Sequence, residues 1–167
     1  MGEKLTRSDV KKIEQEIEYR KLVVRKDALE AVKEARAHGD LSENFEYHAA
    51  KKDKNANESR IRYLERMLKN AQIISDESRP DEVGVNDTVV LYCEDDEEEE
   101  TYRIVTSIRG NSLAGLISTE SPIGKAILHH KVGDRVEVKV NGSYSYYVEI
   151  RSIVKTGEED TDQIRKF

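Results

Sequence analysis

Hydrophobic residues in the first part of the chain recur at helical spacing. From Ser8 to about His38 there is neither Pro nor Gly, and Ser8 is of a residue type that caps helix N-termini. Steps of mostly three and four residues place the hydrophobic positions on one helix face. These positions are Val10, Ile13, Ile17, Val24, Ala28, Ala31 and Ala35. The pattern predicts a helix over 8–38, about 45 Å long.

A second helical pattern runs from Phe45 to Ile74, with steps that alternate strictly between three and four residues. The seam consists of Tyr47, Ala50, Lys54, Asn57, Ile61, Leu64, Leu68 and Ala71. A short connection makes two such helices antiparallel neighbours. The pattern therefore predicts an antiparallel coiled-coil hairpin over 1–75, with its tip at 39–44.

The tip carries two acids, three residues apart. Gly39 suits the left-handed position that ends a helix. Asp40 could cap the second helix, with Glu43 at the spacing of a capping box. The same two carboxylates, at the end of a rod, could instead supply half of a Mg²⁺ site. The residues alone leave both roles open.

Cations flank these acids on both helical stretches. Arg36 precedes the turn, and Lys51, Lys52 and Lys54 follow it. Acids at the tip with bases on the flank could hold a metal ion and a phosphodiester together. The alternative is that these bases only form the solvated face of the coiled coil.

After residue 75 the pattern changes to short runs typical of strands. Residues 76–86 contain Pro80 and Gly84 and are predicted to be a linker. Strands are expected over 88–93, 101–108, 113–118, 136–140 and 144–150. A short helix to about His129 should follow the third strand, with Ser121 as its cap and Pro122 as its first residue. Asn141-Gly142 predicts a two-residue hairpin turn.

The whole pattern predicts an α+β protein. The hairpin is followed by a small globular domain over 87–154 and a polar tail over 155–167.

Charge divides the 167-residue chain in the same place. Residues 1–75 hold 17 Lys and Arg against 14 Asp and Glu, whereas residues 76–167 hold 11 against 20. This distribution argues against a domain that binds duplex DNA by positive charge alone. The acidic excess includes the run Glu94–Glu100, which we expect at a hairpin tip because adjacent acids repel one another. The run lacks the spacing and the Gly of an EF-hand loop.

Several sequence motifs are absent, and their absence excludes further classes of function. A single Cys excludes an intrachain disulfide, and the four His have no metal-site spacing, so we expect them to be structural or exposed. No Gly-rich phosphate loop or nucleophile motif occurs. No stretch resembles a signal peptide or approaches the ~20 apolar residues of a membrane span. The sequence predicts a soluble, cytoplasmic protein without membrane contact.

Two stretches resemble the bacterial GreA/GreB transcript cleavage factors: "ARAHGDLSENFEYHAAK" at 35–51 and "ISTESPIGKAILHHKVGDRVEVKV" at 117–140. The resemblance implies an FKBP-like globular domain that docks on bacterial RNA polymerase, and a coiled coil that enters its secondary channel. It implies that the acidic tip helps to retain a second Mg²⁺ in the polymerase active centre. Backtracked RNA is then cut near its 3′ end by the polymerase itself, so the factor is accessory and not an enzyme.

The family's functional positions can be transferred residue by residue. Asp40 and Glu43 match its catalytic acids. These two residues would be metal ligands only within the polymerase active centre. No cofactor is expected to bind tightly to the chain itself. The matching tip-support residues are Gly39, Leu41, Ser42 and Asn44. Arg36 and Lys51 match basic positions that face the extruded RNA end, and Lys52 and Lys54 are added from charge alone. Ser121 and Pro122 match the docking motif. We expect a monomer.

Some positions depart from the family pattern. Phe45 stands where the family usually has Ala, and the acidic run 94–100 is unusual. One alternative is a channel-binding regulator that inhibits or modulates transcription without stimulating cleavage. Another is a free-standing prolyl isomerase, which the lack of Trp disfavours because such pockets are lined by aromatic residues.

Overall fold

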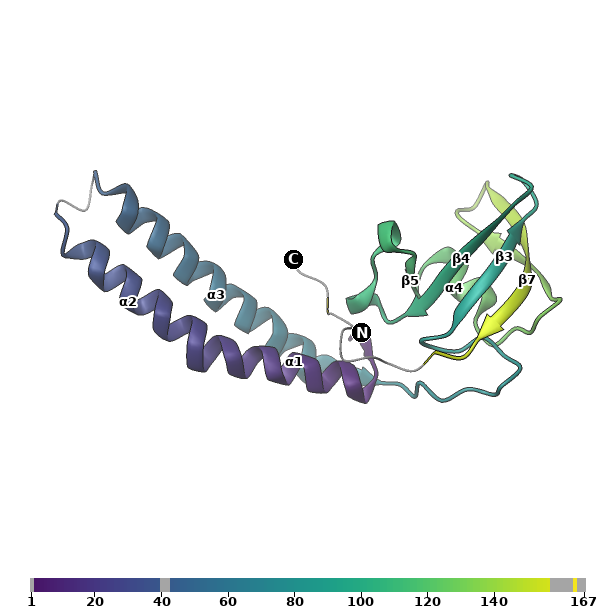
Figure 1. The fold of residues 1–167 in the computed structure, drawn as a ribbon, viewed down its shortest axis with the longest axis horizontal. Coiled ribbons are helices and arrows are strands. Elements are labelled where there is room, and N and C mark those ends of the chain that lie inside the picture. The colour runs from purple at the N-terminus through teal and green to yellow at the C-terminus, as the bar shows by residue number, and fades with distance from the viewer. Residues whose placement is uncertain (1, 40–42, 157–163, 165–167) are drawn as a thin grey trace. The chain divides into compact units, whose positions relative to one another are not determined.

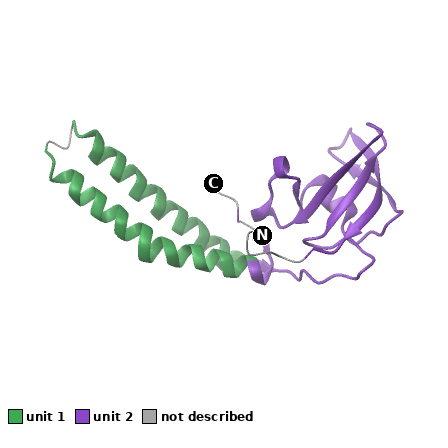
Figure 2. Cartoon of the chain, viewed as in Figure 1, with its two compact units in different colours: residues 1–2, 9–71 green, residues 3–8, 72–167 purple. Residues whose placement is uncertain are grey.

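The computed structural model describes residues 2–39, 43–156 and 164. They form two compact units, shown in different colours in Figure 2. The first comprises residues 1–2 and 9–71, and the second comprises residues 3–8 and 72–167. The first unit is a helical hairpin, and the second is built around a curled β-sheet (Figure 1).

The hairpin consists of two antiparallel helical arms (Figure 1). The first arm contains α1 (Arg7–Tyr19), a π-helical segment η1 (Arg20–Val24) and α2 (Arg25–Arg36). The second arm is α3 (Phe45–Asn70). The predicted hairpin is confirmed, but α1 begins at Arg7, so Ser8 is inside the helix and is not its cap. The second arm ends at Asn70, four residues before the predicted boundary.

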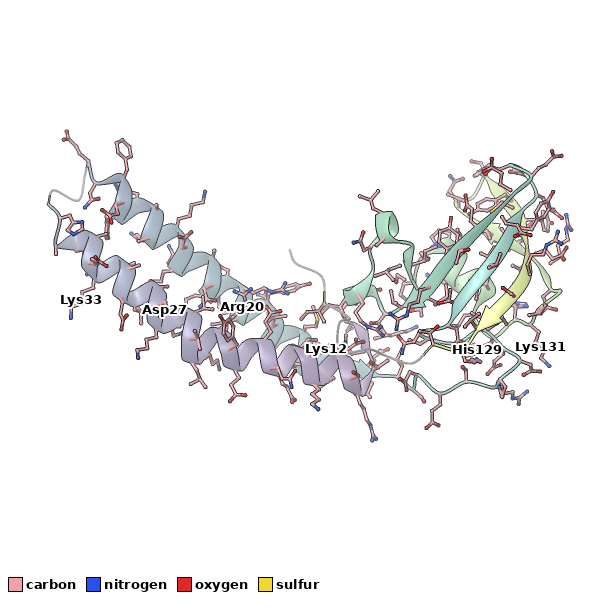
Figure 3. The ribbon with its side chains drawn as sticks, in the orientation of Figure 1. Lys12, Arg20, Asp27, Lys33, His129 and Lys131 are labelled. Atoms are coloured by element: carbon pink, nitrogen blue, oxygen red, sulfur yellow. The ribbon has the colours of Figure 1, made fainter. Side chains whose placement is uncertain are left out.

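Polar residues hold the middle of the hairpin together. Arg60 Nε donates to Glu16 Oε2 at 2.9 Å, and Arg20 Nε donates to the same oxygen at 2.7 Å. Arg20 Nη1 also donates to Asn57 Oδ1 at 3.0 Å, and Asn57 Nδ2 donates to the Arg20 carbonyl at 3.3 Å. Arg20 is labelled in Figure 3. We call Glu16, Arg20, Asn57 and Arg60 the polar cluster.

The π-helical segment explains why the predicted seam is only partly correct. The Arg25 amide donates to the Arg20 carbonyl, a five-residue spacing that inserts one extra residue into the turn. In the helix that follows, the predicted seam residue Ala31 is exposed and its neighbour Val32 is buried instead. In α3 the buried residues are Tyr47, Asn57, Arg60, Ile61, Leu64 and Met67, whereas Lys54 of the predicted seam is only half-buried.

The second unit contains a five-stranded sheet in the order β5-β4-β3-β7-β6. Its strands are β3 (Thr88–Cys93), β4 (Glu98–Val105), β5 (Leu116–Ser118), β6 (Arg135–Lys139) and β7 (Ser145–Val154). All neighbours are antiparallel except β4 and β5, which are parallel. A separate parallel pair joins β1 (Lys4–Leu5) to β2 (Gln72–Ile73).

Helix α4 (Pro122–Ile127) lies against β6 and β5. The buried cluster of this unit contains only Val, Leu, Ile and Cys side chains, contributed by the strands, by α4 and by Val83. Gly124 allows α4 to approach β5, because a Cβ at this position would lie 2.1 Å from the Ser118 carbonyl oxygen. The sheet core therefore depends on close packing of apolar side chains.

Several predicted boundaries in this unit are wrong. Residues 76–86 are not a free linker, because Val83 and Val85 are buried and the Val83 amide donates to the His130 carbonyl at 2.9 Å. The third expected strand shortens to β5, since 3₁₀ turns η2 (Ser107–Arg109) and η3 (Ser112–Ala114) precede it. The β6–β7 connection is longer than two residues, because the last cross-strand pair is Lys139 with Ser145.

The acidic run divides between a turn and a strand. Residues 94–97 form the turn between β3 and β4, as expected for a hairpin tip, whereas residues 98–100 belong to β4. Arg135 makes a two-point contact with Glu94, with N–O distances of 2.7 and 2.9 Å. In the described part of the chain, every helix is too short or too polar to cross a membrane.

Candidate functional site

The turn between α2 and α3 is the place where the predicted acids lie. Asp40, Leu41 and Ser42 are outside the described residues, so the role predicted for Asp40 stays a prediction. Glu43 is exposed. Gly39 lies three residues beyond the end of α2 and has φ +135°, a backbone conformation that L side chains rarely adopt. Glycine is therefore required where the chain leaves the first arm.

Asn44, not Asp40, caps the second arm. Its Oδ1 accepts from the Tyr47 amide at 3.0 Å, and its Nδ2 donates to the Ala35 carbonyl at 2.7 Å. The proposed capping box is wrong because α3 begins at Phe45, which leaves Glu43 before the helix. A carboxylate could only accept, whereas the amide both caps α3 and ties it to the end of α2. Asn44 thus joins the two ends of the turn.

Tyr47 is the centre of the packing just behind the tip. It is buried against Val32 and Ala35. The Arg36 guanidinium carbon lies 5.6 Å from the centroid of its ring. A hydrogen bond with Arg36 lowers the pKa of the Tyr47 phenol below its ordinary value, and the charge of Lys51 adds to the effect against the opposing effect of burial.

The four predicted cations therefore do not form one group. Arg36, Lys51 and Lys54 act together on the Tyr47 phenol. Lys52 is exposed and lies elsewhere on α3, because a helix turns about 100° per residue and Lys52 is five residues beyond Tyr47. A further cation, Lys33, is exposed on α2 and is labelled in Figure 3. The sequence predicted one basic patch, whereas in the structure Lys52 lies on a different face of α3 from Lys51 and Lys54.

His38 and Glu46 form a second link across the turn. His38 Nδ1 lies 3.1 Å from Glu46 Oε2, and both side chains are exposed. Like the Asn44 bridge, this contact joins the end of the first arm to the start of the second. Sequence spacing did not predict this contact, although the alternation of acid and base around Gly39 could have indicated it.

The predicted docking motif lies at the start of α4. Ser121 Oγ accepts from the Gly124 amide at 3.1 Å and donates to the Ser118 carbonyl at 2.7 Å, so Ser121 is the helix cap. Pro122 is the first helical residue. Both predictions of local structure are confirmed. Glu120, directly before the cap, pairs with Lys4 at 3.0 Å.

Cys93, in β3, is a free and buried cysteine. Burial, followed by the charge of Glu100, raises the pKa of the Cys93 thiol to about 11. A thiol with this pKa stays protonated and is a poor nucleophile. The described residues include no cluster of three or more His, Cys, Asp or Glu side chains that could hold a metal ion.

Comparison with known proteins identifies relatives over most of the chain. Residues 3–73 match the family model "Transcription elongation factor, N-terminal", and residues 77–155 match "Transcription elongation factor, GreA/GreB, C-term". The chain is 49% identical over 137 residues to transcription elongation factor GreA of Thermoanaerobacter pseudethanolicus, covering 81% of this chain and 87% of that protein. It is 47% identical over 139 residues to the GreA of Geobacillus kaustophilus, covering 83% and 88%.

A similar solved structure is that of GreA factor homolog 1 of Thermus thermophilus. It has 26% sequence identity and a TM-score of 0.43, and the match covers 93% of this chain and 100% of that one.

Proposed function

Because the chain belongs to the GreA/GreB family of transcription elongation factors, we propose that it stimulates the Mg²⁺-dependent cleavage of backtracked RNA by bacterial RNA polymerase. The hairpin enters the secondary channel of the polymerase and carries its acidic tip to the active centre. The cleavage is the polymerase's own reaction, so the factor is accessory. Renewal of the RNA 3′ end lets an arrested complex resume elongation.

The observation that carries this proposal is the exposed Glu43 at the end of a tied helical hairpin. Glu43 directly precedes Asn44, whose side chain is hydrogen-bonded to both arms. The fixed backbone at residue 44 limits the positions that the Glu43 carboxylate can occupy. A two-metal site needs such positioned oxygen ligands to hold its weaker metal ion, and Asp40 of the family motif would supply the second carboxylate.

The bases behind the tip have different tasks under this proposal. Arg36 lies over the Tyr47 ring and so stabilises the base of the tip, and Arg36, Lys51 and Lys54 would present positive charge to the phosphates of the RNA. Docking would involve the rigid start of α4, where Ser121 and Pro122 are fixed by the cap. These assignments follow the family motif, and the local geometry is compatible with them.

The test is a cleavage time course on a defined backtracked complex. We expect Glu43→Gln and Asp40→Asn to abolish stimulated cleavage while polymerase binding is retained, because each change removes a metal ligand and keeps the side-chain shape. Glu34→Gln is the matched control, since Glu34 is an exposed acid near the end of α2.

Full cleavage by either isosteric variant would overturn the metal-ligand role. Wild-type protein that releases no RNA fragments, and instead slows nucleotide addition, would replace the proposal with a channel-blocking regulator.

A further inference from the structure

Phe45 is an exposed aromatic residue at the tip of the hairpin. It is the first residue of α3, and 87% of its surface is accessible, compared with 9% for Tyr47 two residues later. Two residues correspond to about 200° of helical rotation, so the two rings lie on opposite sides of α3. Tyr47 packs between the arms, and Phe45 faces away from them.

Phe45 begins a stripe of exposed side chains along α3. Steps of four, three and four residues place Ala49, Lys52 and Ala56 on the same helix face. All of these residues are exposed. Lys52 lies about 10 Å from Phe45 along the helix axis. The small Ala49 leaves space between the aromatic ring and the ammonium group.

This combination of side chains suits a single nucleic-acid strand. Proteins that hold single strands without sequence preference stack bases on aromatic rings and place cations along the backbone. Phe45 provides an open ring face, and Lys52 provides a cation that can reach a phosphate of the same strand. Lys52 does so on a face that is separate from Arg36, Lys51 and Lys54.

We propose that Phe45 stacks against the 3′-terminal base of the backtracked RNA and that Lys52 contacts a phosphate of the same RNA end. The inference rests on the proposed function, because it places the RNA end beside the tip. It assigns substrate binding to a residue that the cleavage chemistry does not use. RNA is favoured over a protein partner because the ring is followed on its own face by a cation and small residues, not by further apolar side chains.

The test compares two backtracked complexes that differ only at the RNA 3′ end, which carries either a natural base or an abasic nucleotide. With subsaturating factor, we expect Phe45→Ala to slow cleavage of the natural complex about tenfold and to have little effect on the abasic complex. Phe45→Tyr should behave as wild type. Tyr19→Ala is the matched control, since Tyr19 is exposed on α1.

The dependence on salt concentration distinguishes the stacking of Phe45 from the phosphate contact of Lys52. The effect of Phe45→Ala should be the same at low and high ionic strength, because stacking is not screened. The effect of Lys52→Gln should be smaller and should diminish as salt is raised, because a phosphate contact is electrostatic.

A second measurement does not depend on cleavage. A photoreactive p-benzoyl-phenylalanine in place of Phe45 should crosslink to the terminal RNA nucleotide in a backtracked complex held without Mg²⁺. Crosslinks to polymerase alone, or equal loss of cleavage by Phe45→Ala on both complexes, would overturn the inference in favour of a protein contact. If wild-type protein releases no fragments but the RNA crosslink forms, the proposed function fails and the RNA contact stands.

Discussion

The hairpin and the sheet unit are held together by different kinds of contact. The sheet unit has a large apolar cluster of buried Val, Leu, Ile and Cys side chains, and its buried polar groups, such as Asp87 paired with Lys155, lie outside that cluster. The middle of the hairpin instead depends on the polar cluster, in which Arg60 is buried against Glu16 with 5% of its side chain exposed. A two-helix rod has one narrow interface and little apolar surface to bury. The hydrogen bonds of the polar cluster therefore help to fix how its arms align, whereas the larger apolar cluster of the sheet unit supplies most of the buried packing there.

The largest expected effect is the loss of the Glu16 charge. We expect Glu16→Gln to destabilise the hairpin by about 3 kcal/mol, because it leaves the buried Arg60 guanidinium without its carboxylate. Native-state hydrogen exchange would show the loss in α1 and α3. Glu14→Gln, an exposed change on the same helix, should stay within about 0.5 kcal/mol of wild type.

A matched change in the sheet sharpens the contrast. Leu91→Met keeps the volume of a fully buried side chain, so it should lower the free energy of unfolding by less than about 1.5 kcal/mol. Hydrogen-exchange protection should be lost only in the sheet unit. If Leu91→Met lowers the free energy of unfolding more than Glu16→Gln does, then the apolar core is more sensitive to substitution than the polar cluster, and the contrast between the two units is wrong.

Low pH should destabilise the hairpin by protonating the Glu16 carboxylate. Burial alone would raise the pKa of Glu16, but the hydrogen bonds and charges of Arg60 and Arg20 lower it below the ordinary 4.5. The hydrogen bond from Arg25 likewise lowers the pKa of Glu58. A carboxyl group with a lowered folded-state pKa stabilises the fold above its ordinary pKa, and this contribution is lost as pH falls through the folded-state value.

We therefore expect hydrogen-exchange protection of the hairpin to be steady above pH 4.5 and to fall below it. The loss should be smaller than that caused by Glu16→Gln, because protonation is incomplete just below pH 4.5. Glu16→Gln should reduce the slope, since one titrating group is removed. Equal slopes in the variant and in wild type would show that Glu16 does not carry the acid dependence.

The same contrast explains what could be predicted from the sequence. Regular periodicity predicted the two arms, and alternation predicted β3 with its observed bounds, Thr88–Cys93. The polar cluster was missed because Glu16 and Arg60 are 44 residues apart, and the π-helical segment breaks the spacing on which the prediction depended. Pro and Gly near 80–84 suggested a linker, although the nearby Val83 packs into the core.

At the candidate site, residue types were more informative than spacing. Ser121 was correctly predicted as a cap because Ser followed by Pro favours a helix start. The cap of α3 was assigned to Asp40, although Asn44 is also a favoured capping residue. The bond from Asn44 to the Ala35 carbonyl connects the two arms, and no local pattern specifies such a contact.

The smallest expected effect concerns this cap. Asn44→Ala should destabilise the hairpin by about 1 kcal/mol, because it removes the acceptor for the Tyr47 amide and the donor to the Ala35 carbonyl. Asn44→Asp keeps the hydrogen-bond acceptor and loses the donor. The stability of its hairpin should therefore lie between that of wild type and that of Asn44→Ala. Asn55→Ala is the control, since Asn55 is exposed within α3.

Hydrogen exchange of the first turn of α3 measures the cap, and the rate of stimulated cleavage measures how well the turn is positioned. If both arms must be tied for Glu43 to be placed, Asn44→Asp should lower cleavage even though the helix start stays protected. Unchanged protection in Asn44→Ala would contradict the role of Asn44 as the cap. Unchanged cleavage in Asn44→Asp would show that the cap alone positions the tip and that the bond to Ala35 is dispensable.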